Sequence, residues 1–147
     1  MLSKDFKEFV TLLIENKVDY LIVGGYAVGQ YGYPRYTGDL DIWLAIDKEN
    51  VLKTLNVLKE FGFQSLNLSE NDFFKIGNII QLGYPPLRID LLNEIDGVTF
   101  SECFQNMNKI KIDGMLVNFI SYDDLVLNKK SSGRHKDLDD IENMKRD

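Results

Sequence analysis

The 147-residue chain contains one cysteine, one histidine and three prolines, and these scarcities exclude several kinds of protein. The lone Cys103 cannot form an internal disulfide, and no cluster of cysteine and histidine offers the spacing of a zinc site. Cys103 is therefore expected to be a small buried hydrophobe. A protein without disulfides fits a reducing compartment, which predicts a cytoplasmic protein.

Long apolar runs are also absent, because the N-terminal residues 1–8 already interleave acidic and basic side chains. This excludes a signal peptide or a membrane span, so no membrane partner is expected. Seventeen lysines and arginines stand against 23 acidic residues, which gives a net charge of −6. Proteins that coat nucleic acid need a basic footprint, so a nucleic-acid partner would need a local basic patch.

The chain has the composition of an ordinary globular protein, with 44% hydrophobic and 27% charged residues. No internal repeat, low-complexity tract or linker divides it. The length suits one compact domain with its own core. We therefore expect a single domain over residues 1–147.

Hydrophobic periodicity predicts a mixed α/β (α+β) fold. A helix is expected over residues 4–16, and a second helix capped by Asp47 is expected to end at Gly62. Asp113-Gly114 signals a hairpin turn. Two helices are expected near the C-terminus, one after Ser121 and one from about Lys136. Strands are expected at residues 20–23, 39–44, 78–82, 87–92, 109–112 and 116–120. The fold class is a mixed central β-sheet flanked by helices, with a helical C-terminal segment.

Asp39 and Asp41 carry the first chemical signal. At positions i and i+2 of a strand they project from the same face, close enough to share a hard cation. Two ionised carboxylates side by side oppose each other's charge, and a metal ion relieves that repulsion. An isolated D-x-D is more often a solvated strand face, so the surrounding sequence decides between the two interpretations.

Gly24-Gly25 supplies that context, because it lies between a predicted strand and the start of a helix of residues 26–31. Glycines let backbone N–H groups approach a phosphate closely, and a helix N-terminus adds a favourable partial charge. A glycine pair alone is usually a turn. Because Gly24-Gly25 lies one strand before Asp39 and Asp41, the two features together predict a site for a triphosphate with its magnesium.

Asp90 is the candidate third carboxylate, since its neighbours Ile89 and Leu91 are apolar as a buried strand requires. Nucleotidyl transfer needs metals that neutralise charge and a group that orients the attacking hydroxyl. The hypothesis is that Asp39 and Asp41 hold the metals and Asp90 completes the second metal site. The alternative is a solvating residue at a strand edge.

These motifs resemble the DNA polymerase β-like nucleotidyltransferase superfamily: an apolar strand, Gly24-Gly25, the D-x-D of Asp39 and Asp41, and a later Asp90. More narrowly, Arg35-x-Thr37 before Asp39 is similar to small relatives of the AbiEii-type nucleotidyltransferase toxins. The stretches 127–130 and 134–141 resemble the lysine motif and the R-x-K-D-x-x-D motif of that group. The chain ends at Asp147 without the C-terminal helical domain of the larger toxins.

The resemblance implies a nucleotidyltransferase fold and an enzyme that transfers a nucleoside monophosphate from a triphosphate to a hydroxyl of RNA, protein or a small molecule. It implies Mg²⁺, in a two-metal site, with Mn²⁺ as the alternative ion. The partners would be the triphosphate, an acceptor such as tRNA, and a cognate toxin or antitoxin protein. The implied nucleotide-binding residues are Gly24, Gly25, Arg35, Thr37, Lys129 and Asp137. Asp137 would lie near the nucleotide or orient Lys129. The second hypothesis is a nucleotide-binding regulatory or antitoxin-like module with little turnover.

Several residues keep two interpretations. Arg35 could pair with Asp39 or Asp41, or bind a triphosphate. The basic residues after position 128 could form a phosphate-binding patch or an ordinary solvated helix face. Trp43 shares the face of the two aspartates and could border the site or cover the sheet. Four aromatic side chains could stack on a nucleobase but more often pack: Tyr26, Tyr31, Tyr33 and Tyr36.

Overall fold

The computed structural model describes residues 2–35, 37–84 and 87–146. Tyr36, one of the four tyrosines considered for base stacking, lies outside these ranges, as do two residues of the turn expected between the third and fourth strands. Within the described residues, no helix combines the length and apolar character that crossing a bilayer requires.

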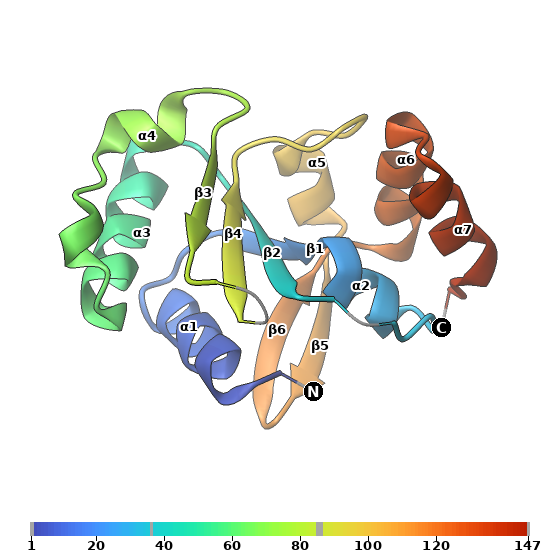
Figure 1. Ribbon diagram of the computed structural model, residues 1–147, viewed down its shortest axis with the longest axis horizontal. Coiled ribbons are helices and arrows are strands. Elements are labelled where there is room, and N and C mark those ends of the chain that lie inside the picture. Colours follow the sequence, from blue (N-terminus) through green and yellow to red (C-terminus); the bar gives the residue numbers. More distant parts are fainter. Residues whose placement is uncertain (1, 36, 85–86, 147) are drawn as a thin grey trace.

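The centre of the molecule is a six-stranded sheet with the order β3-β4-β2-β1-β6-β5 (Figure 1). β2 runs parallel to β4 and β1 runs parallel to β6, whereas β1–β2, β3–β4 and β5–β6 are antiparallel pairs. The predicted mixed sheet is therefore confirmed. The strands are β1 (Tyr20–Val23), β2 (Asp39–Leu44), β3 (Ile79–Leu82), β4 (Arg88–Leu92), β5 (Asn108–Ile112) and β6 (Met115–Phe119).

Helices flank this sheet, as predicted. α1 and α3 lie side by side, where the rings of Phe9 and Phe61 meet edge to face, and α6 and α7 form a pair at the opposite end of the molecule (Figure 1). This pair is the predicted helical C-terminal segment. The helices are α1 (Lys4–Glu15), α2 (Gly24–Gln30), α3 (Lys48–Phe61), α4 (Glu70–Phe74), α5 (Phe100–Gln105), α6 (Tyr122–Ser132) and α7 (His135–Asn143).

Local capping explains where several helices begin and end. The side chains of Ser3, Asp47 and Ser121 each accept a hydrogen bond from a backbone N–H in the first turn of α1, α3 and α6. Gly62 ends α3 with a φ of 98°, in the left-handed region that glycine adopts without strain. The caps therefore fix most boundaries within a residue or two of those expected. The short helices α4 and α5 were not predicted.

The two faces of β2 differ, and this difference positions the site. Leu40 and Ile42 are fully buried on one face, while Asp39, Asp41 and Trp43 alternate with them on the other. The ring of Trp43 packs edge to face on Phe100 of α5, with 5.2 Å between centroids. Trp43 therefore covers the sheet beneath α5, and the two aspartates occupy the more open part of the same face.

Candidate functional site

Asp39, Asp41 and Asp90 meet on one face of the sheet. β2 and β4 run parallel in a register that sets Asp41 opposite Asp90 and Asp39 opposite Arg88. One carboxylate oxygen from each aspartate lies within 4.8 Å of those of the other two. The structure thus brings the three candidate catalytic residues together, although 49 positions separate Asp41 from Asp90 in the sequence.

The electrostatics of this triad favour a cation. Burial, followed by the charges of Asp39 and Asp90, raises the pKa of Asp41 to about 7. Burial also raises the pKa of Asp90, against the opposing effect of Arg88. Carboxylate oxygens are the ligands that Mg²⁺ and Mn²⁺ prefer, so the donor set fits a hard divalent cation that would relieve this repulsion.

Arg88 is part of the same cluster and was not predicted. Its Nε and one terminal nitrogen donate to the two oxygens of Asp90 at 2.9 and 3.0 Å, and that terminal nitrogen also lies 3.3 Å from Asp39 Oδ2. The i, i+2 spacing of Arg88 and Asp90 places both on one strand face, the same signal that linked Asp39 to Asp41. The spacing of Arg88 and Asp90 was therefore the sequence signal that points to Arg88.

Gly24 and Gly25 lie directly against the acidic residues of β2. A Cβ on Gly24 would collide with the carboxylate of Asp41, and one on Gly25 would lie 2.7 Å from Thr37 Oγ1. Gly24 has a φ of 67°, and α2 begins at this residue, so the pair opens the helix and does not form a separate turn before it. The backbone at the start of α2 therefore approaches the triad as closely as glycine allows.

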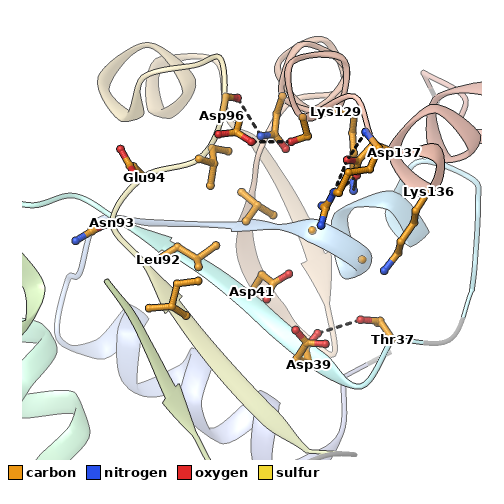
Figure 2. Close-up of a pocket in the computed structure, with 18 of the residues that line it drawn as sticks. Thr37, Asp39, Asp41, Leu92, Asn93, Glu94, Asp96, Lys129, Lys136 and Asp137 are labelled. Atoms are coloured by element: carbon orange, nitrogen blue, oxygen red, sulfur yellow. Dashed lines mark hydrogen bonds and ion pairs between the residues drawn. The ribbon is translucent and has the colours of Figure 1, made fainter. Parts of the chain in front are cut away.

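A cavity of about 400 Å³ opens beside Asp39 and Asp41 (Figure 2). The start of α2, β2, the segment after β4 and the α6–α7 pair line it. All six residues expected to bind the nucleotide line this cavity, together with Asp39 and Asp41: Gly24, Gly25, Arg35, Thr37, Lys129 and Asp137. Asp90 belongs to the carboxylate triad but is not among the cavity-lining residues.

Lys129 forms the basic side of the cavity from α6. It is 6% exposed, and its Nζ lies 3.3 Å from Asp137 Oδ1 and 3.0 Å from Asp140 Oδ2. Asp137 therefore contacts the lysine directly, and the two roles that the resemblance implied for it remain predictions. Burial opposes ionisation of Asp137, but hydrogen bonds from Arg134 and the charge of Lys129 outweigh it and lower its pKa.

Asp140 links Lys129 to Arg35 and was not predicted as a site residue. Both nitrogens of the Arg35 fork donate to its carboxylate, at 2.9 and 3.0 Å. Arg35 therefore pairs with Asp140 on α7 and not with Asp39 or Asp41, and Tyr33 likewise contacts Asp139 of α7. Asp140 lies three residues after Asp137, so it shares that face of the helix, and this spacing was the available signal.

Arg134 and Lys136, two of the basic residues considered for a phosphate-binding patch, also line the cavity. Three other residues lie in the core or on the surface. Cys103 is buried, as expected, and burial raises its pKa to about 12. The hydroxyl of Tyr31 donates to the carbonyl of Ile120 at 2.7 Å, so this tyrosine packs in the core. Lys130 is exposed and lies outside the cavity, which separates it from its neighbour Lys129.

The mixed sheet, with a carboxylate triad beside a glycine-led helix start and a buried lysine, has the fold of a nucleotidyltransferase-type protein. The chain belongs to the nucleotidyl transferase family of unknown function DUF2204, whose family model matches residues 2–147. Membership of this family supports a nucleotidyltransferase-like function and a nucleotide substrate. Among curated proteins, none matches the chain significantly in sequence.

Two solved structures share the fold. A protein assigned as a nucleotidyltransferase from Thermotoga maritima superposes with a TM-score of 0.61 at 12% identity, over 93% of this chain and 88% of that one. An antigenic nucleotidyltransferase-like protein from Paracoccidioides brasiliensis gives 0.57 at 18% identity, over 95% of this chain and 74% of its own. At 12% and 18% identity, the similarity to these two structures shows a shared fold and nothing further.

Proposed function

We propose that this protein is a Mg²⁺-dependent nucleotidyltransferase that moves a nucleoside monophosphate from a triphosphate to a hydroxyl acceptor. The observation that carries the proposal is the carboxylate triad, with oxygens within 4.8 Å, at the edge of a cavity of about 400 Å³ that Lys129 and Arg35 line. Acidic ligands for metal and cations for phosphate are the two requirements of phosphoryl-group transfer.

The donor triphosphate would lie between the start of α2 and the α6–α7 pair. Gly24 lies against Asp41 and Gly25 against Thr37, so backbone N–H groups at these glycines, at the start of α2, would bind a phosphate beside Asp41. Lys129 and Arg35 line the cavity and would supply positive charge to the phosphate oxygens. Asp137 and Asp140 would hold these two cations in place.

The triad would hold the metal ions. Asp39 and Asp41 would hold the ions of a two-metal site, with Mn²⁺ as an alternative to Mg²⁺, and Asp90 would complete the second site. When bound, the ions neutralise charge on the reacting phosphate and favour the ionised acceptor hydroxyl. Asp90 lies closest to the β3 side of the site, because β4 separates β2 from β3.

The Arg35-x-Thr37 motif and the buried Lys129–Asp137 pair favour a place near the small AbiEii-type relatives, as part of a toxin–antitoxin pair. A nucleotide-binding regulatory module with little turnover is the second candidate. The observation in its favour is that Arg88 already engages Asp90 and Asp39, so a metal ion must compete for both carboxylates.

Thermal unfolding with each of the four ribonucleoside triphosphates, with and without Mg²⁺, tests the proposal. A ligand that binds only the native state raises the melting temperature by mass action, and we expect an increase that requires Mg²⁺. If no triphosphate raises the melting temperature at millimolar concentration, the proposed nucleotide site is wrong. Binding without transfer of an α-³²P label to any acceptor would favour the regulatory module.

A further inference from the structure

The edge strand β3 lies next to the candidate site and is open to solvent. Within the described residues β3 pairs with β4 alone, so its outer backbone edge faces no other strand. The register sets Gln81 of β3 opposite Asp90 and Ile79 opposite Leu92. Partners in an antiparallel pair share a sheet face, so both side chains continue the face that carries the triad.

The two edges of the sheet differ in chemistry. β5, the edge far from the triad, carries exposed Lys109 and Lys111, charges of the kind that discourage another chain from pairing. β3 carries no charged residue, and none occurs anywhere from Ile76 to Leu87. Only the edge beside the site is left without this protection.

Exposed apolar side chains surround β3. Ile76 before the strand is 65% exposed and Tyr84 after it is 86% exposed, while Ile79 and Leu87 are also exposed. Lys75, directly before Ile76, is exposed, while Arg88 after the strand already binds Asp90 and Asp39. A single free lysine is not the basic footprint that binding the phosphates of RNA requires. An apolar, uncharged edge suits an extended polypeptide.

The chemistry of transfer places the acceptor on this side. The attacking and leaving oxygens lie roughly in line across the phosphorus. The donor phosphates of the proposed function lie toward α2 and Lys129, on the β1 side of β2, so the attacking hydroxyl must come from the opposite side. Across the sheet that direction leads over Asp90 on β4 to β3.

We propose that the acceptor is a tyrosine in an extended polypeptide that pairs with the open edge of β3. This inference rests on the proposed function and specifies its acceptor. A chain paired with β3 lies two strand spacings from β4, about 9.5 Å from Asp90. A residue of the added chain that shares the triad face projects above the sheet beside Gln81, and among hydroxyl side chains tyrosine reaches furthest, so it alone can lean across β3 and β4 toward the donor phosphate. Gln81, whose side-chain amide has no partner within the described residues, is placed to bind the incoming residue.

In the proposed reaction, the phenolic oxygen attacks the α-phosphorus of the nucleoside triphosphate and forms a new phosphorus–oxygen bond. The bond from that phosphorus to the oxygen bridging to the β-phosphate breaks, and pyrophosphate leaves with the electron pair. The phenolic proton passes to solvent. The product is a tyrosine carrying a nucleoside monophosphate through a phosphodiester.

The test uses α-³²P-labelled ribonucleoside triphosphates with Mg²⁺, the full chain and two acceptor pools. One pool is a library of short synthetic peptides with valine or isoleucine at alternate positions and tyrosine, serine or threonine at the centre. The other is total tRNA. We expect label in the tyrosine peptides, with the added mass on the tyrosine, and far less in the other peptides and in tRNA.

A pair of double variants tests the docking edge. Ile76→Lys with Tyr84→Lys places charge at both ends of β3, outside the residues that line the donor cavity, and should reduce labelling of tyrosine peptides by about tenfold. Leu52→Lys with Leu116→Lys changes two exposed apolar residues on α3 and β6 and should keep it. Melting temperatures of both variants verify folding.

The outcomes separate this inference from the proposed function. Label on tRNA, on serine or threonine, or on no pool overturns the tyrosine acceptor when a triphosphate with Mg²⁺ still raises the melting temperature. Equal labelling by the Ile76/Tyr84 variant and the wild type overturns the docking edge. Absence of the Mg²⁺-dependent thermal shift would instead refute the proposed function itself.

Discussion

Arg88 and Asp90, two residues apart on β4, form a two-point ion pair in which the guanidinium covers both carboxylate oxygens at 2.9 and 3.0 Å. The same guanidinium reaches Asp39 on β2. The pair ties the third carboxylate of the triad to the first. Arg88 therefore supplies positive charge at the place where a divalent cation would bind.

The first prediction concerns competition between Arg88 and metal. Arg88→Gln should lower the melting temperature in EDTA, because Asp90 is buried and loses its cation. The same change should increase the stabilisation by Mn²⁺, since the metal no longer displaces an arginine. Melting curves with increasing Mn²⁺ measure both effects. A smaller Mn²⁺ shift than in the wild type would mean that Arg88 supports the metal site.

The second prediction concerns the pH dependence of stability. The pKa of Asp41 is about 7 in the folded protein against an ordinary value of 3.8. Between these values the native state retains a proton that the unfolded state has released, so the free energy of unfolding falls as pH rises. The stability from this group is fully present below about pH 4 and is lost as pH rises through about 7.

Asp41→Asn should remove this pH dependence. In EDTA at pH 8 we expect the variant to be more stable than the wild type by roughly 1–3 kcal/mol, with a smaller difference near pH 4. Asp39→Asn is the comparison, since Asp39 loses a contact with Arg88 and should gain less. Urea unfolding at both pH values measures this. Destabilisation of the Asp41 variant at pH 8 would indicate a structural carboxylate.

The third prediction separates Lys129 from Lys130. Lys129→Ala should weaken triphosphate binding by roughly 1–3 kcal/mol, the range for a charge-assisted hydrogen bond, and affect monophosphate binding less. It should also lower the melting temperature, because Asp137 and Asp140 lose a buried partner. Titration calorimetry in Mg²⁺ gives the affinities.

Lys130→Ala is the matched control, because this neighbour is exposed and outside the cavity. It should bind the triphosphate like the wild type. Equal affinities for Lys129→Ala and wild type would remove Lys129 from the donor site and leave it a role in packing α6 against α7.

The fourth prediction concerns the glycines of α2. Gly24→Ala should destabilise the protein by roughly 1–3 kcal/mol, because the residue has a positive φ and its Cβ would displace the Asp41 carboxylate. Gly29→Ala is the control: nothing lies within 4 Å of its Cβ, and alanine favours the helix by up to about 1 kcal/mol. Thermal unfolding of both variants tests this contrast. Equal stability of Gly24→Ala and wild type would argue against the close approach of Gly24 to the Asp41 carboxylate.

Local patterns in the sequence predicted much of the fold. The alternation in residues 39–44 gave the two faces of β2, and Asp113-Gly114 gave the β5–β6 hairpin, where both residues have the positive φ that such turns need. The short helices α4 and α5 were not predicted, because five or six residues are too few to show a helical period.

What the sequence determined by itself is whatever depends on neighbours along the chain: the shared face of Asp39 and Asp41, the glycines before them, and the order of the helices and strands. The tertiary structure decided which strands pair, and with that the meeting of Asp90 with Asp41, the approach of Arg88 to Asp39 and the open edge at β3. It also joined Arg35 to Asp140, 105 positions further along the chain. Strand order and helix docking arise from burial summed over the whole core. A local hydrophobic period of two or 3.6 residues therefore does not indicate them.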